Sequence, residues 1–221
     1  ERLDLPDPWM RHAAVVAAPV LGALLTGAVF HLVPSAFRGH GVSRVLYAVN
    51  RQGSSIPLRI GVRHWLASTF TIGSGGSAGP EGPIVTIGAT IGSNAARWLG
   101  GTGASMATLL GCGAAAGIAS VFNAPMAGIF FTLEVILRDF SLRTFTPIVV
   151  ASVVSAATTQ TMLGSQQPLF GAGPDFFQDQ ALQLTQTPLF VALGAFCAIP
   201  AVGFMRLLPA AERFFARAPV P

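Results

Sequence analysis

The chain has 221 residues, of which 52% are hydrophobic and only 10% are charged, and its mean hydropathy is +0.61. A soluble domain carries about 25% charged residues, so this composition excludes a soluble globule and also intrinsic disorder. All 13 basic residues are arginine, which excludes lysine chemistry such as Schiff bases and phosphate-loop lysines. The arginines flank apolar runs and form no basic stripe, so we expect no nucleic-acid partner.

The N-terminal third predicts one membrane helix and one shorter element. Residues 1–12 are polar and contain two arginines, so we expect a cytoplasmic N-terminal segment. Residues 13–37 contain no Asp, Glu, Lys or Arg, and their length suffices to span about 30 Å of hydrocarbon. Residues 38–63 hold five arginines, which predicts a short or re-entrant helix over 42–49 and then a polar loop.

The middle of the chain predicts helices that are broken by glycine and proline. A glycine-rich break at 73–83 separates two predicted helical pieces, roughly 62–72 and 83–98. Residues 98–137 predict two short helices that are separated by an Asn-Ala-Pro turn. Glycines recur at four-residue spacing, a pattern that lets helix backbones approach closely in lipid; these pairs are Gly88 with Gly92 and Gly113 with Gly117.

The C-terminal third contains two further charge-free runs, 144–174 and 180–205. Each is long enough for a membrane helix, and the Gln-, Pro- and Gly-rich segment 164–188 predicts an extramembrane loop between them. The whole pattern indicates an all-α, multi-pass integral membrane protein of about seven or eight helical pieces, whose surroundings are the lipid bilayer.

Glu81 is the only formal charge between Arg63 and Arg97. A carboxylate at membrane depth is costly and by default functional. Pro83 suits the first turn of a helix, whose free N–H groups and positive dipole end then face the space beside Glu81. We therefore predict an anion site with its own carboxylate, which occupies the site when ionised and leaves it when protonated. The alternative is a structural acid that is ion-paired or stabilises the helix dipole.

A competing interpretation of the same segment is nucleotide binding. Residues 73–78, Gly-Ser-Gly-Gly-Ser-Ala, fit the dinucleotide fingerprint. That fingerprint needs a preceding strand and an acid about 20 residues later, and the sequence has no acid between Glu81 and Glu134. We regard this as the weaker alternative.

Three other features carry weaker signals. The segment Arg38-Gly39-His40-Gly41-Val42 is a second glycine-framed turn before an apolar helix, with His40 as a candidate donor, although an ordinary turn explains it equally well. Glu134 is interpreted as a structural acid that pairs with Arg138 at i+4. The histidines and cysteines lack ligand spacing, so we expect no metal site and no cofactor.

At this point the motifs resemble those of a known family. The segment 79–88, which begins Gly-Pro-Glu-Gly-Pro, the run 113–117, the segment 122–128 and Glu134 are similar in order and spacing to the CLC chloride channels and proton/chloride antiporters. The resemblance extends from about residue 13 to the end. It implies a CLC-type inverted-repeat fold with re-entrant and broken helices, one anion pathway per subunit, a homodimer, a bacterial inner (plasma) membrane location, and a transporter rather than an enzyme.

The resemblance also assigns roles to individual residues. Glu81 falls on the gating glutamate, and Asn123, Pro125 and Glu134 fall on a structural motif. The anion-binding positions are Gly39, His40, Gly41, Val42, Gly79, Gly82, Pro83 and Ile84.

Three positions depart from the family pattern. Pro80 replaces an arginine and removes one backbone donor, His40 replaces a serine, and Ser43 replaces a proline. The departures at Pro80 and His40 leave open whether the anion is chloride, fluoride or nitrate.

Val135 bears on the mechanism. It stands where antiporters of this family often carry a second glutamate. The resemblance therefore favours glutamate-gated, channel-like chloride transport, with a proton-coupled antiporter as the alternative.

The resemblance also divides the chain. Residues 13–163 correspond to the first repeat and residues 189–221 to the start of the second, and the family's later motifs are missing. We expect a truncated chain, the N-terminal half of the membrane domain. A further alternative is therefore a non-conducting fragment.

Overall fold

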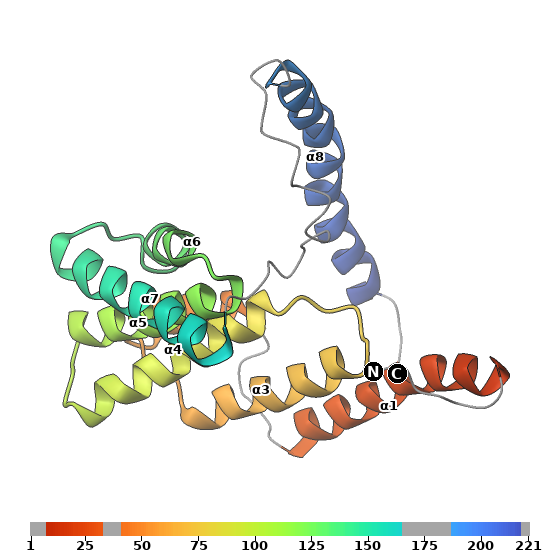
Figure 1. Cartoon of the computed structure of the whole chain (residues 1–221), viewed down its shortest axis with the longest axis horizontal. Helices are drawn as coiled ribbons and strands as arrows, with labels where there is room; N and C mark the ends of the chain where they lie inside the picture. Colours follow the sequence, from red (N-terminus) through yellow and green to blue (C-terminus); the bar gives the residue numbers. More distant parts are fainter. Residues whose placement is uncertain (1–7, 33–40, 165–186, 218–221) are drawn as a thin grey trace. The chain divides into compact units, whose positions relative to one another are not determined.

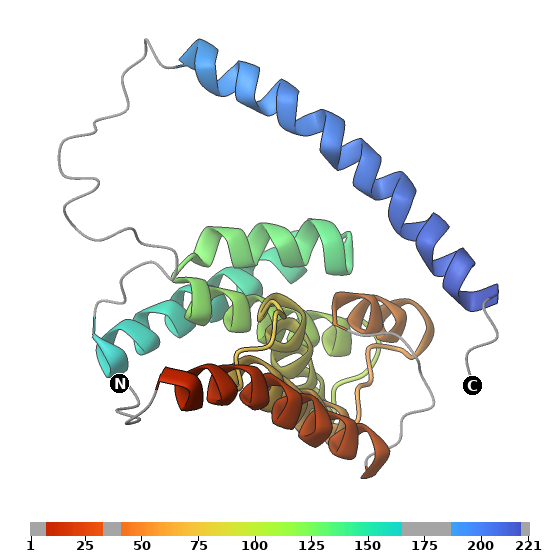
Figure 2. The same ribbon diagram turned by 90° about the vertical axis from the view of Figure 1, so that its right-hand side faces the viewer.

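The computed structural model describes residues 8–32, 41–164 and 187–217. The chain divides into two compact units, residues 1–169 and residues 170–221. Among the described residues, the first unit contains seven α-helices and one π-helical segment, and the second contains a single helix (Figures 1 and 2). In chain order these are α1 (Pro8–Leu32), α2 (Val42–Arg51), α3 (Leu58–Gly73), α4 (Glu81–Trp98), α5 (Ala104–Phe122), α6 (Pro125–Phe131), η1 (Thr132–Leu137), α7 (Leu142–Leu163) and α8 (Thr187–Arg217).

The predicted all-α membrane architecture is confirmed for the described residues, which contain helices and no strand. Four helices are long and apolar enough to cross a membrane, over Ala13–Leu32, Ala104–Phe122, Leu142–Leu163 and Thr187–Ala211. The short helix predicted at 42–49 is α2, and the two predicted pieces around the glycine-rich break are α3 and α4.

One predicted element is wrong in length. The segment before the Asn-Ala-Pro turn is not a short helix, because α5 runs for 19 residues and could cross a bilayer. Its glycines lie among alanines, which favour a helix most strongly. Contact with neighbouring helices on two sides holds the glycine-rich part in helical form.

The α1 and α3 helices lie side by side and antiparallel (Figures 1 and 2). The Thr26 hydroxyl, on α1, donates to the Ala67 carbonyl at 3.2 Å and lies 2.9 Å from the Thr71 hydroxyl. One turn earlier, a Cβ added at Gly22 would collide with the side chain of Ser74. Small and hydroxyl-bearing residues therefore set the separation of these two helices.

The predicted glycine spacing is confirmed as a helix–helix contact between α4 and α5. A Cβ added at Gly88 would strike the Gly113 carbonyl, and one added at Gly92 would strike the Leu109 carbonyl. The two backbones are in direct contact along this seam, here called the glycine seam. The buried side chains of Val85, Ala89 and Leu110 continue the core on either side of it.

The C-terminal half of α4 also fixes the loop between α2 and α3. The Ser93 hydroxyl donates to the Ser54 carbonyl at 2.8 Å and accepts the Ile56 N–H at 2.9 Å. The Asn94 amide donates to the carbonyls of Ile56, at 3.0 Å, and Thr90, at 2.7 Å. All these groups are buried, so the loop is held by satisfied hydrogen bonds.

The predicted ion pair between Glu134 and Arg138 is not formed in the described structure. Residues 132–137 wind as a π-helix, and Arg138 adopts a left-handed conformation with φ of 54°. The i+4 spacing of an α-helix, on which the prediction rested, therefore does not apply to this pair.

The second unit is described by itself. Its helix α8 runs for 31 residues with Pro200 and Pro209 inside it. The predicted loop at 164–188 lies almost wholly outside the described residues, as does the segment 1–7.

Candidate anion site

Two helix N-termini meet in the first unit, those of α2 and α4. A Cβ added at Gly41, which precedes α2, would lie 3.1 Å from the Cα of Gly82 in the first turn of α4. In the reverse direction, a Cβ added at Gly82 would lie 3.3 Å from the Cα of Gly41. Gly41 has a φ of 58°, a conformation that favours glycine. The absence of side chains at these two positions lets the backbones touch.

The first turn of α4 leaves few backbone donors for a ligand. Pro80 and Pro83 have no N–H, and the N–H of Ile84 already donates to the Pro80 carbonyl at 3.0 Å. The N–H groups of Glu81 and Gly82 are therefore the donors that this turn can offer. Ile84, predicted to bind the anion, does not supply a free N–H.

The Glu81 side chain begins α4 and is exposed. Its carboxylate lies against Gly79, where any Cβ would overlap it. Within the described part of the chain, the carboxylate makes no hydrogen bond and no ion pair. The ion-paired alternative is therefore not seen here, and a favourable interaction with the helix dipole remains as the structural alternative.

The other predicted anion-binding residues divide into two groups. Gly41, Val42, Gly79, Gly82 and Pro83 all lie at the junction of α2 and α4 or next to it. Gly39 and His40 lie outside the described residues, so their predicted roles stay predictions.

The dinucleotide alternative is wrong, because residues 73–78 follow the helix α3 rather than a strand. The N–H groups of Ser74, Gly75 and Gly76 donate to the carbonyls of Phe70, Ile72 and Thr71, at 3.2, 3.0 and 2.8 Å. These donors close the last turn of α3 and are not available to a phosphate.

The Asn-Ala-Pro turn is fixed by α7. Asn123 ends α5 in a left-handed conformation, and its side-chain oxygen accepts a hydrogen bond from the Gln160 amide at 2.5 Å. The Ser152 hydroxyl donates to the Pro125 carbonyl at 2.8 Å. Neither Ser152 nor Gln160 was predicted to fix this turn, because their only signal in the sequence is their polarity within an apolar run.

Glu134 and Val135 occupy the π-helical segment η1. Glu134 is exposed, whereas Val135 is half-buried. π-Helical turns occur often at functional sites, but within the described residues Glu134 forms no hydrogen bond and no ion pair.

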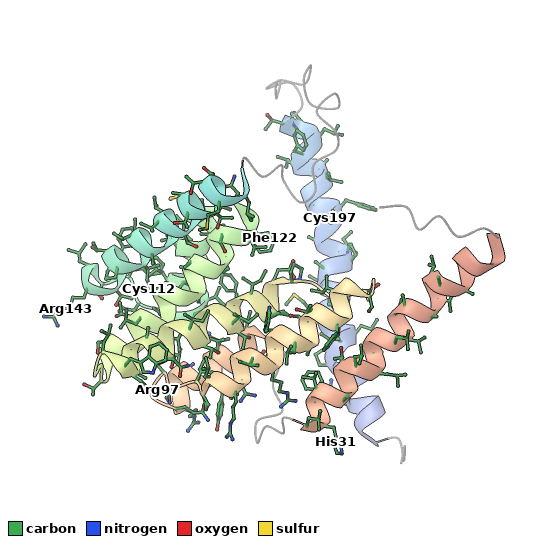
Figure 3. All side chains as sticks on the ribbon, turned by 60° about the horizontal axis from the view of Figure 1, so that its bottom comes forward. His31, Arg97, Cys112, Phe122, Arg143 and Cys197 are labelled. Carbon is green, nitrogen blue, oxygen red and sulfur yellow. The ribbon has the colours of Figure 1, made fainter. Side chains whose placement is uncertain are left out.

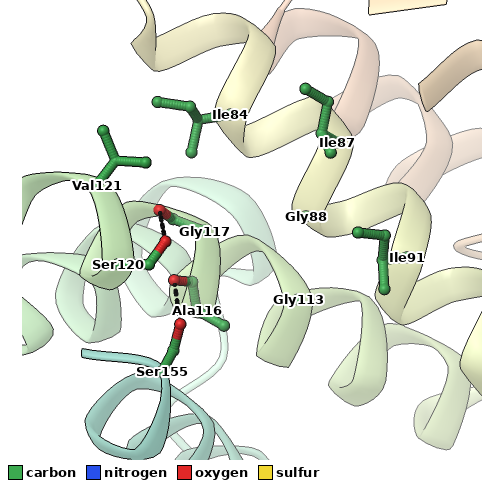
Figure 4. A pocket seen from close by; sticks show the side chains of 10 residues that line it. All are labelled: Ile84, Ile87, Gly88, Ile91, Gly113, Ala116, Gly117, Ser120, Val121 and Ser155. Carbon is green, nitrogen blue, oxygen red and sulfur yellow. Dashed lines mark hydrogen bonds between the residues drawn. The ribbon is translucent and has the colours of Figure 1, made fainter. Parts of the chain in front are cut away.

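A groove of about 360 Å³ lies along the glycine seam, between α4 and α5 (Figure 4). Its α4 wall presents Ile84, Ile87 and Ile91, and its floor contains Gly113 and Gly117 of α5. The Ser155 hydroxyl of α7 reaches its edge but donates to the Ala116 carbonyl at 2.9 Å. The groove is apolar, so it suits a packed helix better than an ion.

The sequence is similar to those of known chloride channel proteins. A family model described as "Voltage gated chloride channel" matches residues 21–221. The chain is 31% identical to "Chloride channel protein CLC-f" of Arabidopsis thaliana over 216 residues, which cover 92% of this chain and 25% of the relative. It is 31% identical to "Chloride channel protein CLC-e" of the same plant, covering 90% and 27%.

The fold comparison agrees with the sequence comparison. The chain matches the crystal structure of a slow cyanobacterial Cl⁻/H⁺ antiporter with a TM-score of 0.74 and 24% identity, covering 94% of this chain and 48% of that one. The predicted CLC-type fold is thereby confirmed. The chain spans about a quarter of the length of the two plant relatives and about half of the antiporter chain.

Proposed function

The chain belongs to the voltage-gated chloride channel (CLC) family, and from this premise we propose that it supplies one half of a transmembrane anion pathway. The observation that carries the proposal is the contact between Gly41 and Gly82, because it brings the N-termini of α2 and α4 together. Partial positive charge from both helix ends converges on one point, and such a point favours an anion.

We assign the gate of this pathway to Glu81. Its carboxylate has no partner among the described residues and lies in the same turn as the free N–H groups. When ionised, it competes with the anion for these donors; when protonated, it loses its charge and leaves them to the anion. Anion flux therefore rises as the pH falls.

We propose that the pathway is channel-like, because Val135 has no group that could carry a proton. A specific observation supports the alternative, proton-coupled exchange. The protein whose structure this chain matches is a slow cyanobacterial Cl⁻/H⁺ antiporter. Recording proton movement against an imposed chloride gradient separates the two, since a channel moves no protons.

The remaining half of the fold completes the pathway in this proposal. The chain spans 48% of the antiporter chain, and its apolar groove between α4 and α5 offers a surface for packing. We also propose a homodimer in a bacterial inner membrane, with chloride or another small anion as the transported species. If the other half is required, the chain alone is non-conducting and flux appears only when that half is supplied.

Chloride efflux from reconstituted vesicles, measured between pH 4.5 and 7.5 with the complete pathway, tests the gate. Glu81→Gln is expected to remove the pH dependence and to leave flux continuously high. Glu134→Gln is the matched control, because Glu134 is also exposed and unpaired in the described structure. An unchanged pH profile in Glu81→Gln would contradict the assignment.

A further inference from the structure

Several arginines of the first unit gather at one end of its helices. Helices α1 and α3 are antiparallel, so the start of α3 lies beside the end of α1 (Figures 1 and 2). Arg63 marks this contact, because its guanidinium lies over the Phe30 ring, 4.2 Å from the ring centroid. Arg59 is one turn earlier on α3. These two arginines therefore lie where α1 ends.

Arg51 and Arg97 lie at the same end. The Asn94 amide, near the end of α4, donates to the carbonyl of Ile56 in the loop between α2 and α3, at 3.0 Å. Arg51 is the last residue of α2 before this loop, and Arg97 is three residues after Asn94. The ends of α2 and α4 therefore meet beside the start of α3.

Arg138 and Arg143 complete the group. Helix α5 runs antiparallel to α4 along the glycine seam, so it begins where α4 ends. A Cβ added at Gly111, in the first half of α5, would lie against Leu137 at the end of η1 and Ile148 near the start of α7. Arg138 follows η1 directly, and Arg143 is the second residue of α7. We call this end of the unit the arginine end; its arginines are Arg51, Arg59, Arg63, Arg97, Arg138 and Arg143.

The opposite end of the first unit has far fewer arginines. It comprises the start of α1, the break at 74–80 and the ends of α5 and α7. The sequence has no arginine in the break or in residues 158–188, and no lysine anywhere. Among the described residues of this end, Arg11 in α1 is the only arginine. Arg44, in the first turn of α2, is counted at neither end.

The two ends correspond to the two faces of a membrane. Helices α1, α5 and α7 are each long and apolar enough to cross a bilayer, and each has one terminus at the arginine end. Figure 3 shows Arg97 and Arg143 on one side of the first unit and Phe122, the last residue of α5, on the other. The arginines are therefore distributed unequally between the faces.

We propose that the arginine end is the cytoplasmic face of the protein, and that α1 begins on the opposite side of the membrane. Arginines close to the ends of membrane helices are kept on the cytoplasmic side, and the rule counts basic residues, since acids contribute little to it. The cytoplasmic leaflet also has a negative surface potential, which favours this charge. Helix α8, taken by itself, has the same asymmetry, because its arginines, Arg206, Arg213 and Arg217, all lie in its C-terminal half.

This orientation is opposite to the one expected from the sequence. The cytoplasmic location predicted for residues 1–12 rested on Arg2 and Arg11. The helix contacts bring a larger number of arginines, from five separate parts of the chain, to the other face. In the proposed orientation the break at 74–80 and the end of α7 are not cytoplasmic. The proposal does not depend on the anion pathway, so either can fail without the other.

Cysteine labelling of the chain in a bacterial inner membrane tests the orientation. Cys112 and Cys197 are first replaced by alanine, and single cysteines are then placed at exposed positions, two at each end. Gln52→Cys and Thr102→Cys report on the arginine end, and Ser77→Cys and Met162→Cys report on the opposite end. Intact spheroplasts are treated with a membrane-impermeant maleimide. Labelling of each purified variant in detergent checks that its cysteine is reactive and that the protein is folded and monodisperse.

We expect Ser77→Cys and Met162→Cys to be labelled equally before and after the spheroplasts are permeabilised. Labelling of Gln52→Cys and Thr102→Cys is expected to be lost in intact spheroplasts and to appear only after permeabilisation. The reverse pattern would overturn the proposal. Equal labelling of all four variants in intact spheroplasts, or labelling of none of them, would overturn it as well, because neither result places the two ends on the proposed sides. Two positions at each end keep the test decisive if one variant does not fold.

Discussion

From Gly88 onward, α4 is fixed on two sides, by the glycine seam to α5 and by the hydrogen bonds of Ser93 and Asn94 to the α2–α3 loop. In its first turn, by contrast, two prolines remove donors and the Glu81 carboxylate has no partner in the described structure. Both ends belong to one 18-residue helix. The packed part of α4 therefore holds in place a first turn whose backbone N–H groups and carboxylate have no partner in the described structure.

Disrupting the glycine seam should have the largest effect. In Gly88→Ala the new methyl group would meet the backbone of Gly113, which cannot rotate away. We expect destabilisation of about 3 kcal/mol or more, at or above the usual range for overpacking, and loss of most monodisperse protein in size-exclusion chromatography. Gly27→Ala is the control, because nothing lies within 4 Å of a Cβ there. Equal yields of monodisperse protein from the two variants would show that the glycine seam is not needed for stability.

Removing the clamp on the α2–α3 loop should have the next largest effect. Asn94→Ala leaves the buried Ile56 carbonyl without the Asn94 amide as donor, at a cost of about 1–3 kcal/mol. We expect the melting temperature in detergent to fall by several degrees, since about 2–4 °C corresponds to each kcal/mol in a chain of this size. Asn50→Ala removes an exposed hydrogen bond to Leu46 and should stay within about 0.5 kcal/mol. A smaller fall for Asn94→Ala than for Asn50→Ala would show that α4 is not fixed by this loop.

Separating the two helix N-termini should affect binding more than stability. In Gly82→Ala the added methyl group would lie 3.3 Å from the Gly41 Cα, so the two backbones must move apart by a few tenths of an ångström. We expect chloride affinity to fall about fivefold, equivalent to about 1 kcal/mol, with little change in melting temperature. Gly73→Ala, in open space at the end of α3, should leave affinity unchanged. Unchanged chloride affinity in Gly82→Ala would show that the junction of α2 and α4 does not bind the anion.

The smallest effect concerns the loop before α7. Hydrogen bonds from the Thr144 hydroxyl and from the backbone N–H and hydroxyl of Ser141 lower the pKa of Asp139 below its usual value. A depressed folded-state pKa stabilises the protein above the unfolded value of about 3.9. This stabilisation is lost as the pH falls through the folded-state pKa. Between pH 5 and 3 the melting temperature should therefore fall slightly more steeply in the unaltered chain than in Asp139→Asn; identical slopes would contradict this.

Sequence reasoning found those features of the site that depend on residue type and spacing. Glycine spacing predicted a close approach of helix backbones, which the structure places between α4 and α5, and Pro83 predicted the start of α4 to within two residues. The sequence also showed that Glu81 is the only formal charge between Arg63 and Arg97. These signals depend on residues that are close together in the sequence, so they can be recognised without knowledge of the tertiary fold.

The features that sequence reasoning missed depend on three-dimensional neighbours. Nothing local distinguishes Ser93 or Asn94 from other small polar residues, because their partners lie 37–39 residues away along the chain. The π-helical winding of η1, which separates Glu134 from Arg138, has no sequence signature. The hydrogen bond from the Ile84 N–H to the Pro80 carbonyl likewise depends on the path of the backbone rather than on residue type.

The central claim, that an anion is held where α2 and α4 meet, is tested most directly by anomalous diffraction from crystals grown in bromide. We expect a bromide peak within hydrogen-bond distance of the Gly82 N–H, and a stronger peak in Glu81→Gln, where the competing carboxylate charge is absent. A bromide peak elsewhere with none beside Gly41 and Gly82, or a peak in the unaltered chain that disappears in Glu81→Gln, would contradict it.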